Sequence, residues 1–370
     1  MISPAHPSTP LGLAIAAVLR TSWRAEPEAP ASSLQERLPR VADILLDTGG
    51  GALGWWRIRD SPLGSSVAAE RLHEAFRLHT LQAALHTKNL EHVLLHLNET
   101  GLVPIVFKGW TMARLYAKPA LRPYGDVDIL VAESDVDRAR TLIARLSPEL
   151  QEFVDLDMRV LRRFLPDRSY AELIARATTE SLGAARLLTL APEDHLRLIC
   201  LHQLDHGGWR PLWLCDVAAF VESLPRSFRW DLCLAGNARL SDAVLALVGL
   251  AEELLGARIP ADTPRGAVPH WFREAVLHGW AGGHQAPPDP LLGLHRLGWR
   301  RALQAVRARW PDPITSTLHL RAPFRGVPRV LLQFGELIRR GAVFIRKTWR
   351  NRFSELPSAV GSAAEQGVVS

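Results

Sequence analysis

Cysteine is scarce in this sequence. Its 370 residues contain three cysteines, Cys200, Cys215 and Cys233, and none of them forms the CxxC spacing of a redox motif or zinc site. Reduced thiols in a hydrophobic core are therefore expected rather than disulfides, which favours a cytoplasmic protein.

The sequence also lacks long apolar runs and a leader segment. It has no stretch of 18 uncharged apolar residues, so no membrane span is predicted. No basic segment precedes the apolar residues Leu11–Leu19, so a signal peptide is not expected. Glycine and proline, 26 residues each, are too few to indicate a low-complexity chain.

Basic residues outnumber acidic residues in this chain. Lysine and arginine number 44 against 38 aspartates and glutamates, which gives a formal net charge of +6, mostly from arginine. This excess fits a polyanionic partner such as a nucleotide, a nucleic acid or an acidic membrane surface, and does not choose among them. The length and the apolar content of 47% predict two or three packed units.

The most informative stretch runs from Val103 to Val131. It reads as a short apolar strand, a turn at Lys108-Gly109, a helix, a basic loop and a second strand with Asp126 and Asp128. Residues two apart on a strand share one face, so these carboxylates should lie side by side. Such a pair suits Mg²⁺, and a glycine at the turn lets the backbone approach a phosphate that the next amides can bind. The stretch therefore predicts phosphoryl or nucleotidyl transfer.

A third predicted strand, Phe153–Val160, carries two more carboxylates. Alternation places Asp155 and Asp157 on one face and the apolar residues on the other. If this strand pairs with the Asp126 strand, Asp155 completes a three-carboxylate cluster, with Asp157 as the alternative third member. Such a cluster can hold two divalent ions about 3.5–4 Å apart.

Apolar residues spaced three and four apart predict helices elsewhere, and after Arg168 only helices are expected. The predicted helices are 11–23, 34–47, 65–97, 133–146, two within 190–223, 240–255, 270–277 and 291–306. The predicted units are an N-terminal helical region with a disordered start (1–74), an α/β core (75–188), a helical domain (189–310), a basic amphipathic segment (311–356) and a disordered tail (357–370).

The segment Arg321–Arg352 has nine basic residues, interleaved apolar residues and a single acid, Glu336. Two interpretations stay open. The segment can be a helix packed on the body with a solvated arginine face, or it can bind RNA or an anionic membrane surface.

On these motifs the chain resembles a family of uncharacterised bacterial nucleotidyltransferases, a branch of the DNA polymerase beta-like superfamily. The resemblance covers about residues 75–225. The matching positions are Lys108-Gly109, Arg122, Asp126-Val127-Asp128, Asp155, Leu201-His202, His206 and Leu212-Trp213-Leu214-Cys215-Asp216.

The resemblance implies an α+β fold, with a small mixed β-sheet as the nucleotidyltransferase core between N-terminal and C-terminal helical regions. It implies Mg²⁺-dependent transfer of a nucleoside monophosphate from an NTP, with ATP the expected donor, to a hydroxyl of a small molecule, peptide, protein or RNA. Pyrophosphate is released, two ions are expected, and Mn²⁺ is an alternative metal. The implied metal ligands and catalytic residues are Asp126, Asp128 and Asp155, and the implied nucleotide-binding residues are Lys108, Gly109, Trp110 and Arg122.

The chain departs from the family pattern in two places. Asp157 stands where the family has a histidine, and the segment before the Asp155 strand is too short for the further strand or hairpin that the family leads us to expect. A degenerate nucleotide- or RNA-binding module that uses the basic C-terminal helix therefore stays as an alternative function.

Several single residues also allow two interpretations. His202, His206 and Asp216 could suggest zinc, but no fourth ligand has a suitable spacing. Arg122 can bind phosphate or pair with an aspartate. Trp110 and Trp213 can stack on a base or fill the core.

Overall fold

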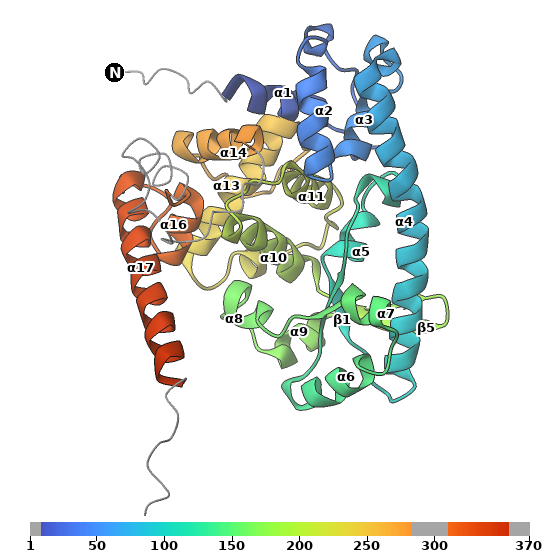
Figure 1. The fold of residues 1–370 in the computed structure, drawn as a ribbon, viewed down its shortest axis with the longest axis vertical. Helices are drawn as coiled ribbons and strands as arrows, with labels where there is room; N and C mark the ends of the chain where they lie inside the picture. The colour runs from blue at the N-terminus through green and yellow to red at the C-terminus, as the bar shows by residue number, and fades with distance from the viewer. Residues whose placement is uncertain (1–8, 283–309, 355–370) are drawn as a thin grey trace, which may run out of the picture.

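The structure is a computed structural model that describes residues 9–282 and 310–354. The disordered start is predicted for residues 1–12; residues 1–8 lie outside the described residues, but residues 9–12 are helical, as part of α1 (Thr9–Leu19). The predicted disordered tail (357–370) and the predicted helix 291–306 also lie outside the described residues. The chain has the expected α+β fold, in which a mixed β-sheet is surrounded by helices (Figure 1).

The N-terminal region is helical. Its helices are α1 (Thr9–Leu19), α2 (Leu38–Asp47), α3 (Gly51–Ile58) and α4 (Val67–Asn98). The long helix α4 begins at Ser66, whose hydroxyl accepts a hydrogen bond from the Ala69 amide, a typical N-cap. Its first half packs against α2 and α3, and its second half packs against the sheet and α6. One helix thus links the N-terminal region to the core.

The sheet has five strands in the order β3-β2-β1-β5-β4. The strands are β1 (Ile105–Phe107), β2 (Val127–Leu130), β3 (Val154–Leu156), β4 (Thr178–Leu182) and β5 (Ala185–Thr189). Strand β1 is antiparallel to β2 and parallel to β5, while β2 and β3 are parallel. The two strands predicted to carry the carboxylates are therefore neighbours in the sheet.

Strands β4 and β5 contradict the expectation of helices alone after Arg168. They form an antiparallel hairpin that turns at Gly183, whose φ of +58° suits a tight turn. In the segment before β3, where the family led us to expect a further strand or hairpin, the chain forms a short helix, α7 (Pro148–Phe153).

The third strand is shorter than predicted. It ends at Leu156 because the chain then turns into helix α8 (Val160–Phe164). The Asp157 amide still bonds to the Ile129 carbonyl, but its carboxylate accepts a hydrogen bond from the Arg159 amide, which begins the turn. Asp157 therefore belongs to a loop rather than to the strand.

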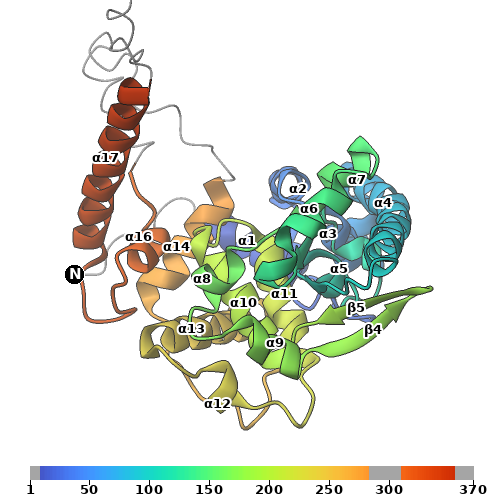
Figure 2. The ribbon, with the colours of Figure 1, turned by 90° about the horizontal axis from the view of Figure 1, so that it is seen from below.

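The remaining helices cover the sheet and build the C-terminal part. Those around the sheet are α5 (Gly109–Ala113), α6 (Val136–Ile143), α7, α8 and α9 (Tyr170–Arg176). Those that follow are α10 (Pro192–Asp205), α11 (Pro211–Glu222), α12 (Trp230–Cys233), α13 (Ala238–Leu255), α14 (His270–Gly282), α16 (Pro313–His319) and α17 (Arg329–Ser354). Figures 1 and 2 place α17 on the side of the molecule away from α4.

Two hydrophobic clusters hold these layers together. The smaller one joins Leu94 of α4 to Val106 of β1 and Ile129 of β2. The larger one runs through the N-terminal helices and the C-terminal helices together, and α1 packs directly on α13 and α14. All three cysteines are buried and free. The body that carries the site is therefore packed continuously from the N-terminal helices to α14.

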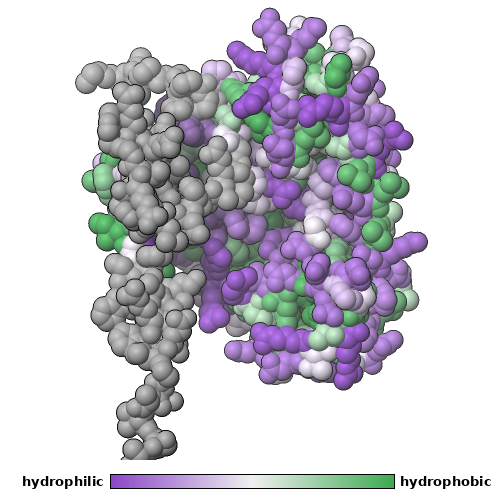
Figure 3. Space-filling view, in the orientation of Figure 1, coloured by the Kyte–Doolittle hydropathy of each residue, from purple (hydrophilic) through white to green (hydrophobic). Residues whose placement is uncertain are grey.

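The surface of α4 is mixed. Its apolar residues Leu78, Leu81 and Leu85 are exposed. On the face of the molecule drawn in Figure 3, small apolar patches lie among hydrophilic side chains. Within the described ranges, none of the helices is both long and apolar enough to cross a membrane.

Candidate active site

Three carboxylates meet at one end of the β2–β3 pair. Parallel register places Asp128 of β2 beside Asp155 of β3, and Asp157 follows directly in the loop. One oxygen of each carboxylate lies within 4.8 Å of one oxygen of each of the others. Asp128 and Asp157 are buried, and Asp155 is half-buried. Carboxylate oxygens gathered in this way form the donor set that a hard divalent cation prefers.

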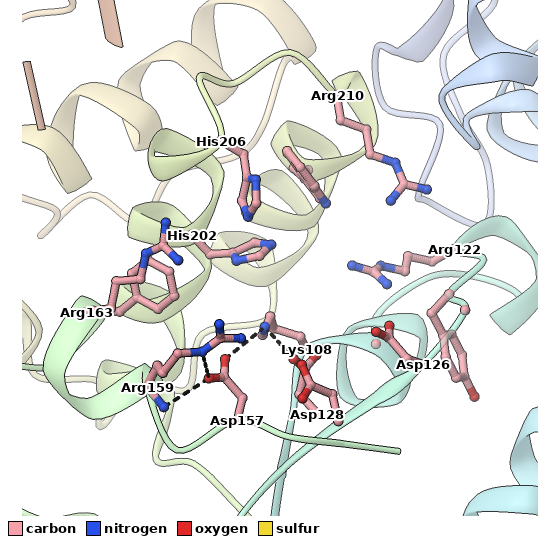
Figure 4. A pocket seen from close by; sticks show the side chains of 16 residues that line it. Lys108, Arg122, Asp126, Asp128, Asp157, Arg159, Arg163, His202, His206 and Arg210 are labelled. Carbon is pink, nitrogen blue, oxygen red and sulfur yellow. Dashed lines mark hydrogen bonds and ion pairs between the residues drawn. The ribbon is translucent and has the colours of Figure 1, made fainter. Parts of the chain in front are cut away.

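Asp126 lies at the rim of this cluster. It directly precedes β2, is exposed, and lines the same pocket as the other acids (Figure 4). Its negative charge helps to raise the pKa of both Asp128 and Asp155, so it acts on the cluster electrostatically. The tight group in the structure is therefore Asp128, Asp155 and Asp157, with Asp126 beside it.

Lys108 reaches into the acidic cluster from the turn after β1. Its Nζ lies 2.6 Å from Oδ1 of Asp128 and 4.0 Å from Oδ2 of Asp157. Its φ of +57° is unusual for a residue other than glycine, and strained backbone of this kind occurs often at functional sites. The ammonium group neutralises part of the negative charge that the carboxylates concentrate here.

Gly109 permits the close approach of this turn to the aspartate strand. Its φ is +27°, and a Cβ atom there would lie 3.0 Å from the backbone oxygen of Asp126. Any side chain would push the turn away from the strand. The requirement for glycine thus follows from the contact between the two halves of the motif.

Burial changes the acidity of the cluster. It raises the pKa of Asp128 to about 6 although Lys108 acts in the opposite direction, and Asp126 and Asp155 raise it further. Burial also raises the pKa of Asp155, together with the charges of Asp157 and Asp126. Carboxylates that repel one another in a buried place are stabilised by a bound cation. The donor set and its electrostatics both fit a divalent metal ion.

Arg122 is paired with an aspartate and does not point freely into the site as a phosphate ligand would. Its Nε and Nη2 donate hydrogen bonds to Asp216 of α11 at 2.8–3.2 Å, and Tyr116 donates another to Asp216 at 2.7 Å. Arg122 and Asp216 are both buried. Of the two interpretations, pairing with an aspartate is the one found, although Arg122 also lines the pocket beside Asp126 (Figure 4). The pair ties the loop before β2 to the helical part.

The opposite wall of the pocket is basic and aromatic. It is contributed mainly by α8, α10 and α11, and Figure 4 shows it facing the carboxylates across a cavity of about 360 Å³. The pKa of His202 lies well below its ordinary value because of burial and the nearby charge of Lys108, so this histidine is neutral. The side chains of this wall are Arg163, His202, His206, Arg210 and Trp213. Arg159 also lines the pocket, but on the acidic side, where its Nε lies 3.5 Å from Oδ1 of Asp157 (Figure 4).

Trp110 does not line this pocket. It packs in the smaller hydrophobic cluster, and the Arg114 guanidinium lies 4.6 Å from the centre of its ring. Trp213 of α11 lines the pocket instead, and its ring centroid lies 5.3 Å from those of His202 and His206. Core filling is thus the interpretation that fits Trp110, while Trp213 faces the site.

The structure offers no support for zinc at His202, His206 and Asp216. In the part of the chain that the structure describes, the carboxylate cluster is the one group of metal-binding geometry, and Asp216 is engaged by Arg122. Sequence reasoning missed Arg159, Arg163 and Arg210, although Arg210 stands between the predicted His206 and Trp213.

Comparison with known proteins agrees with this geometry. The model of a family described as uncharacterised nucleotidyltransferase matches residues 52–149 and 144–256, more than half of the chain. The chain belongs to this family. The pocket-lining residues, from Lys108 to Trp213, all lie inside the matched ranges, so the site belongs to the shared part of the nucleotidyltransferase. Neither the curated proteins nor the solved structures gave a match.

Proposed function

We propose that this nucleotidyltransferase moves a nucleoside monophosphate from an NTP, with ATP the expected donor, to a hydroxyl-bearing acceptor and releases pyrophosphate. The observation that carries the proposal is the pocket with three carboxylates on one wall and arginines, histidines and a tryptophan on the other. A carboxylate wall suits metal ions, and a basic and aromatic wall suits phosphates and a base. A metal–nucleotide complex is the ligand that satisfies both walls.

The metal would be held by Asp128, Asp155 and Asp157, and Asp126, which lines the same pocket, is proposed as a further ligand. Two Mg²⁺ ions, or Mn²⁺, are proposed because carboxylate oxygens are their preferred ligands. When bound, such ions neutralise phosphate charge and lower the barrier to in-line displacement.

The reaction needs an acceptor oxygen, a leaving pyrophosphate and a place for one proton. The acceptor oxygen forms a bond to the α-phosphorus, and the bond from that phosphorus to the bridging oxygen of the β-phosphate breaks with its electrons on pyrophosphate. Asp155 is our candidate to accept the hydroxyl proton, because it is half-buried and its pKa is raised. Arg210 and Trp213 are candidates to bind the phosphates and the base.

Label transfer tests the proposal. The protein is incubated with each NTP labelled in the α-phosphate, Mg²⁺ and a cell extract, and the labelled products are separated. Asp128→Asn and Asp126→Asn should abolish transfer while circular dichroism stays unchanged. Asp137→Asn, an exposed carboxylate change on α6 outside the pocket, is the matched control. Undiminished transfer by Asp128→Asn would contradict the proposal.

The basic C-terminal segment supports a second, separate proposal of contact with an anionic membrane surface or RNA. On α17 the apolar side chains of Leu331 and Ile338 are exposed next to exposed arginines, a combination typical of interfacial helices. Glu336 accepts hydrogen bonds from Arg339 and Arg340 and so reduces their free charge. Sedimentation with anionic and with neutral vesicles, and salt-dependent RNA binding, test this contact. Binding that survives Asp128→Asn would separate it from catalysis.

A further inference from the structure

A second cavity adjoins the candidate active site. Its volume is about 630 Å³, and it shares Arg163 and Phe164 of α8 with the first pocket. Its other walls come from α10, the start of α13 and the segment that includes α16. The two cavities therefore meet at α8, on the side of the active site where Asp157 and Arg159 lie (Figure 4).

The second cavity is strongly basic. Among its described lining residues, Asp205 is the one acid, against Arg162, Arg163, Arg239, Arg321 and His319. The charge of Asp205 is already matched, because it forms an ion pair with Arg163 and faces Nε2 of His319 at 3.8 Å.

Two of these cations remain available for a ligand. In the residues that the structure describes, neither Arg162 nor Arg321 has an ion-pair partner, and both are exposed. Arg239 is partly engaged, since it donates a hydrogen bond to the backbone oxygen of Arg321. That contact helps to hold Arg321, whose φ is +53°, an unusual value for a side-chain-bearing residue. An anionic group could thus be bound by two free guanidinium groups.

The rest of the cavity is apolar. Phe164 and Phe324 are buried in its wall, and Leu318 lies between the polar positions of α16. A cavity of this volume and mixed lining has the size of a small-molecule site. A folded protein or an RNA duplex would need a wider surface.

The two cavities differ in the parts of the chain that form their walls. The first pocket lies entirely within the family match, which ends at residue 256. Residues 317–324 of the second cavity lie outside that match. The donor site is therefore common to the family, whereas the second cavity is partly built by a segment that the family model does not include.

We infer that the second cavity binds the acceptor, and that the acceptor is a small hydroxyl compound carrying a phosphate or carboxylate group. This inference rests on the proposed function. The anionic group binds Arg162 and Arg321, and the hydroxyl passes Arg163 and Phe164 to reach the α-phosphorus. There the new oxygen–phosphorus bond forms as pyrophosphate leaves, and the proton passes to a carboxylate of the cluster.

Fractionated acceptors test the charge of the substrate. A small-molecule extract is split by an anion exchanger into retained and unretained fractions, with RNA and protein fractions as separate arms. Wild-type protein, ATP labelled in the α-phosphate and Mg²⁺ should give labelled product from the retained fraction. Pretreatment of that fraction with phosphatase distinguishes a phosphate from a carboxylate. Transfer to the unretained, RNA or protein fraction instead would overturn the inference.

A double variant tests the two arginines. Arg162→Gln/Arg321→Gln should raise the KM for the retained fraction about tenfold, roughly the effect of two exposed charge-assisted contacts, and leave kcat nearly unchanged. Arg37→Gln/Arg40→Gln removes the same charge from exposed positions outside both pockets and should leave KM unchanged. An unchanged KM in the first double variant would refute the assignment.

A binding measurement separates this inference from the proposed function. The anionic aromatic dye 1-anilinonaphthalene-8-sulfonate is titrated into the wild type, the Arg162→Gln/Arg321→Gln variant and the Asp128→Asn variant. Dye affinity should fall about tenfold in the arginine variant alone, since the change removes two cations. If no transfer occurs yet the dye result holds, the proposed chemistry fails and the anion-binding cavity stands. Equal affinity in all three proteins would sink the cavity assignment.

Discussion

The ammonium group of the half-buried Lys108 forms an ion pair with the buried Asp128, 2.6 Å from its Oδ1. Because Asp128 also belongs to the candidate metal cluster, Lys108 and a metal ion bind the same carboxylate. The lysine thus serves as a counter-ion in the metal-free protein and opposes metal binding. The stability of the protein should therefore depend both on Lys108 and on a bound metal ion.

Replacing this lysine should weaken the metal-free protein and strengthen metal binding. Lys108→Met should lower the free energy of unfolding by about 2 kcal/mol, since a hydrogen bond between charged groups is lost. Mg²⁺ should then raise the melting temperature of the variant more than that of the wild type. Thermal unfolding with and without Mg²⁺ measures both effects. Lys118→Met, at an exposed position, is the control, and an equal metal response in all three proteins would contradict the prediction.

The raised pKa of Asp128 predicts that the stability of the metal-free protein depends on pH. Its pKa is about 6 in the folded protein and about 3.9 in an unfolded chain, so the folded state binds the proton more tightly. The contribution of this group to the stability of the metal-free protein is therefore full below about pH 4 and is lost as the pH rises through about 6.

Metal binding should show the opposite trend, because the ion needs the deprotonated carboxylate. The rise in melting temperature caused by Mn²⁺ should be large at pH 7.5 and should shrink as the pH falls through about 6. Asp128→Asn should abolish most of this pH-dependent rise. A wild-type rise that stays constant from pH 5 to 7.5 would show that Asp128 is not a ligand.

The local sequence pattern was sufficient to predict the central strands of the sheet. Apolar alternation and the Lys108-Gly109 turn predicted β1 and β2, and the carboxylates at Asp128 and Asp155 come together because β2 and β3 are parallel neighbours in register. Strand length could not be read in the same way. Alternation continues past Leu156 to Val160, but the side chain of Asp157 bonds to the Arg159 amide and starts a turn.

Features that depend on distant contacts were not predictable. The hairpin of β4 and β5 has exposed polar residues on β4, so its sequence lacks a clear apolar alternation, and β5 is fixed by pairing with β1. The basic wall includes Arg163 of α8 and Arg210 before α11, which line the same pocket only once the chain has folded. Their spacing in the sequence does not indicate that they share a pocket.

Gly109 and Gly125 offer a matched pair of substitutions near the cluster. Gly109→Ala should cost about 1–3 kcal/mol of stability and reduce label transfer, because the new Cβ would contact the Asp126 backbone at a strained φ. Gly125→Ala, beside Asp126, should be nearly neutral, since no atom lies within 4 Å of its Cβ position. Denaturant unfolding and the transfer assay measure the two effects. Equal behaviour of the two variants would contradict the close-approach argument.

The buried pair of Arg122 and Asp216 should be a structural link rather than a source of net stability. Asp216→Asn should lower the free energy of unfolding by about 3–5 kcal/mol, because it leaves the Arg122 guanidinium buried without its countercharge. Tyr116→Phe should cost about 1 kcal/mol, since it removes one hydrogen bond.

The double variant Arg122→Met/Asp216→Leu should recover much of this loss, because it removes both buried charges and keeps apolar volume. Its transfer activity should nevertheless remain low, since the loop before Asp126 is no longer held to α11 and Arg122 no longer lines the pocket. Urea unfolding of the two single variants and the double variant gives the coupling energy, and the transfer assay gives the activity. A double variant as active as the wild type would mean that the pair does not position the site.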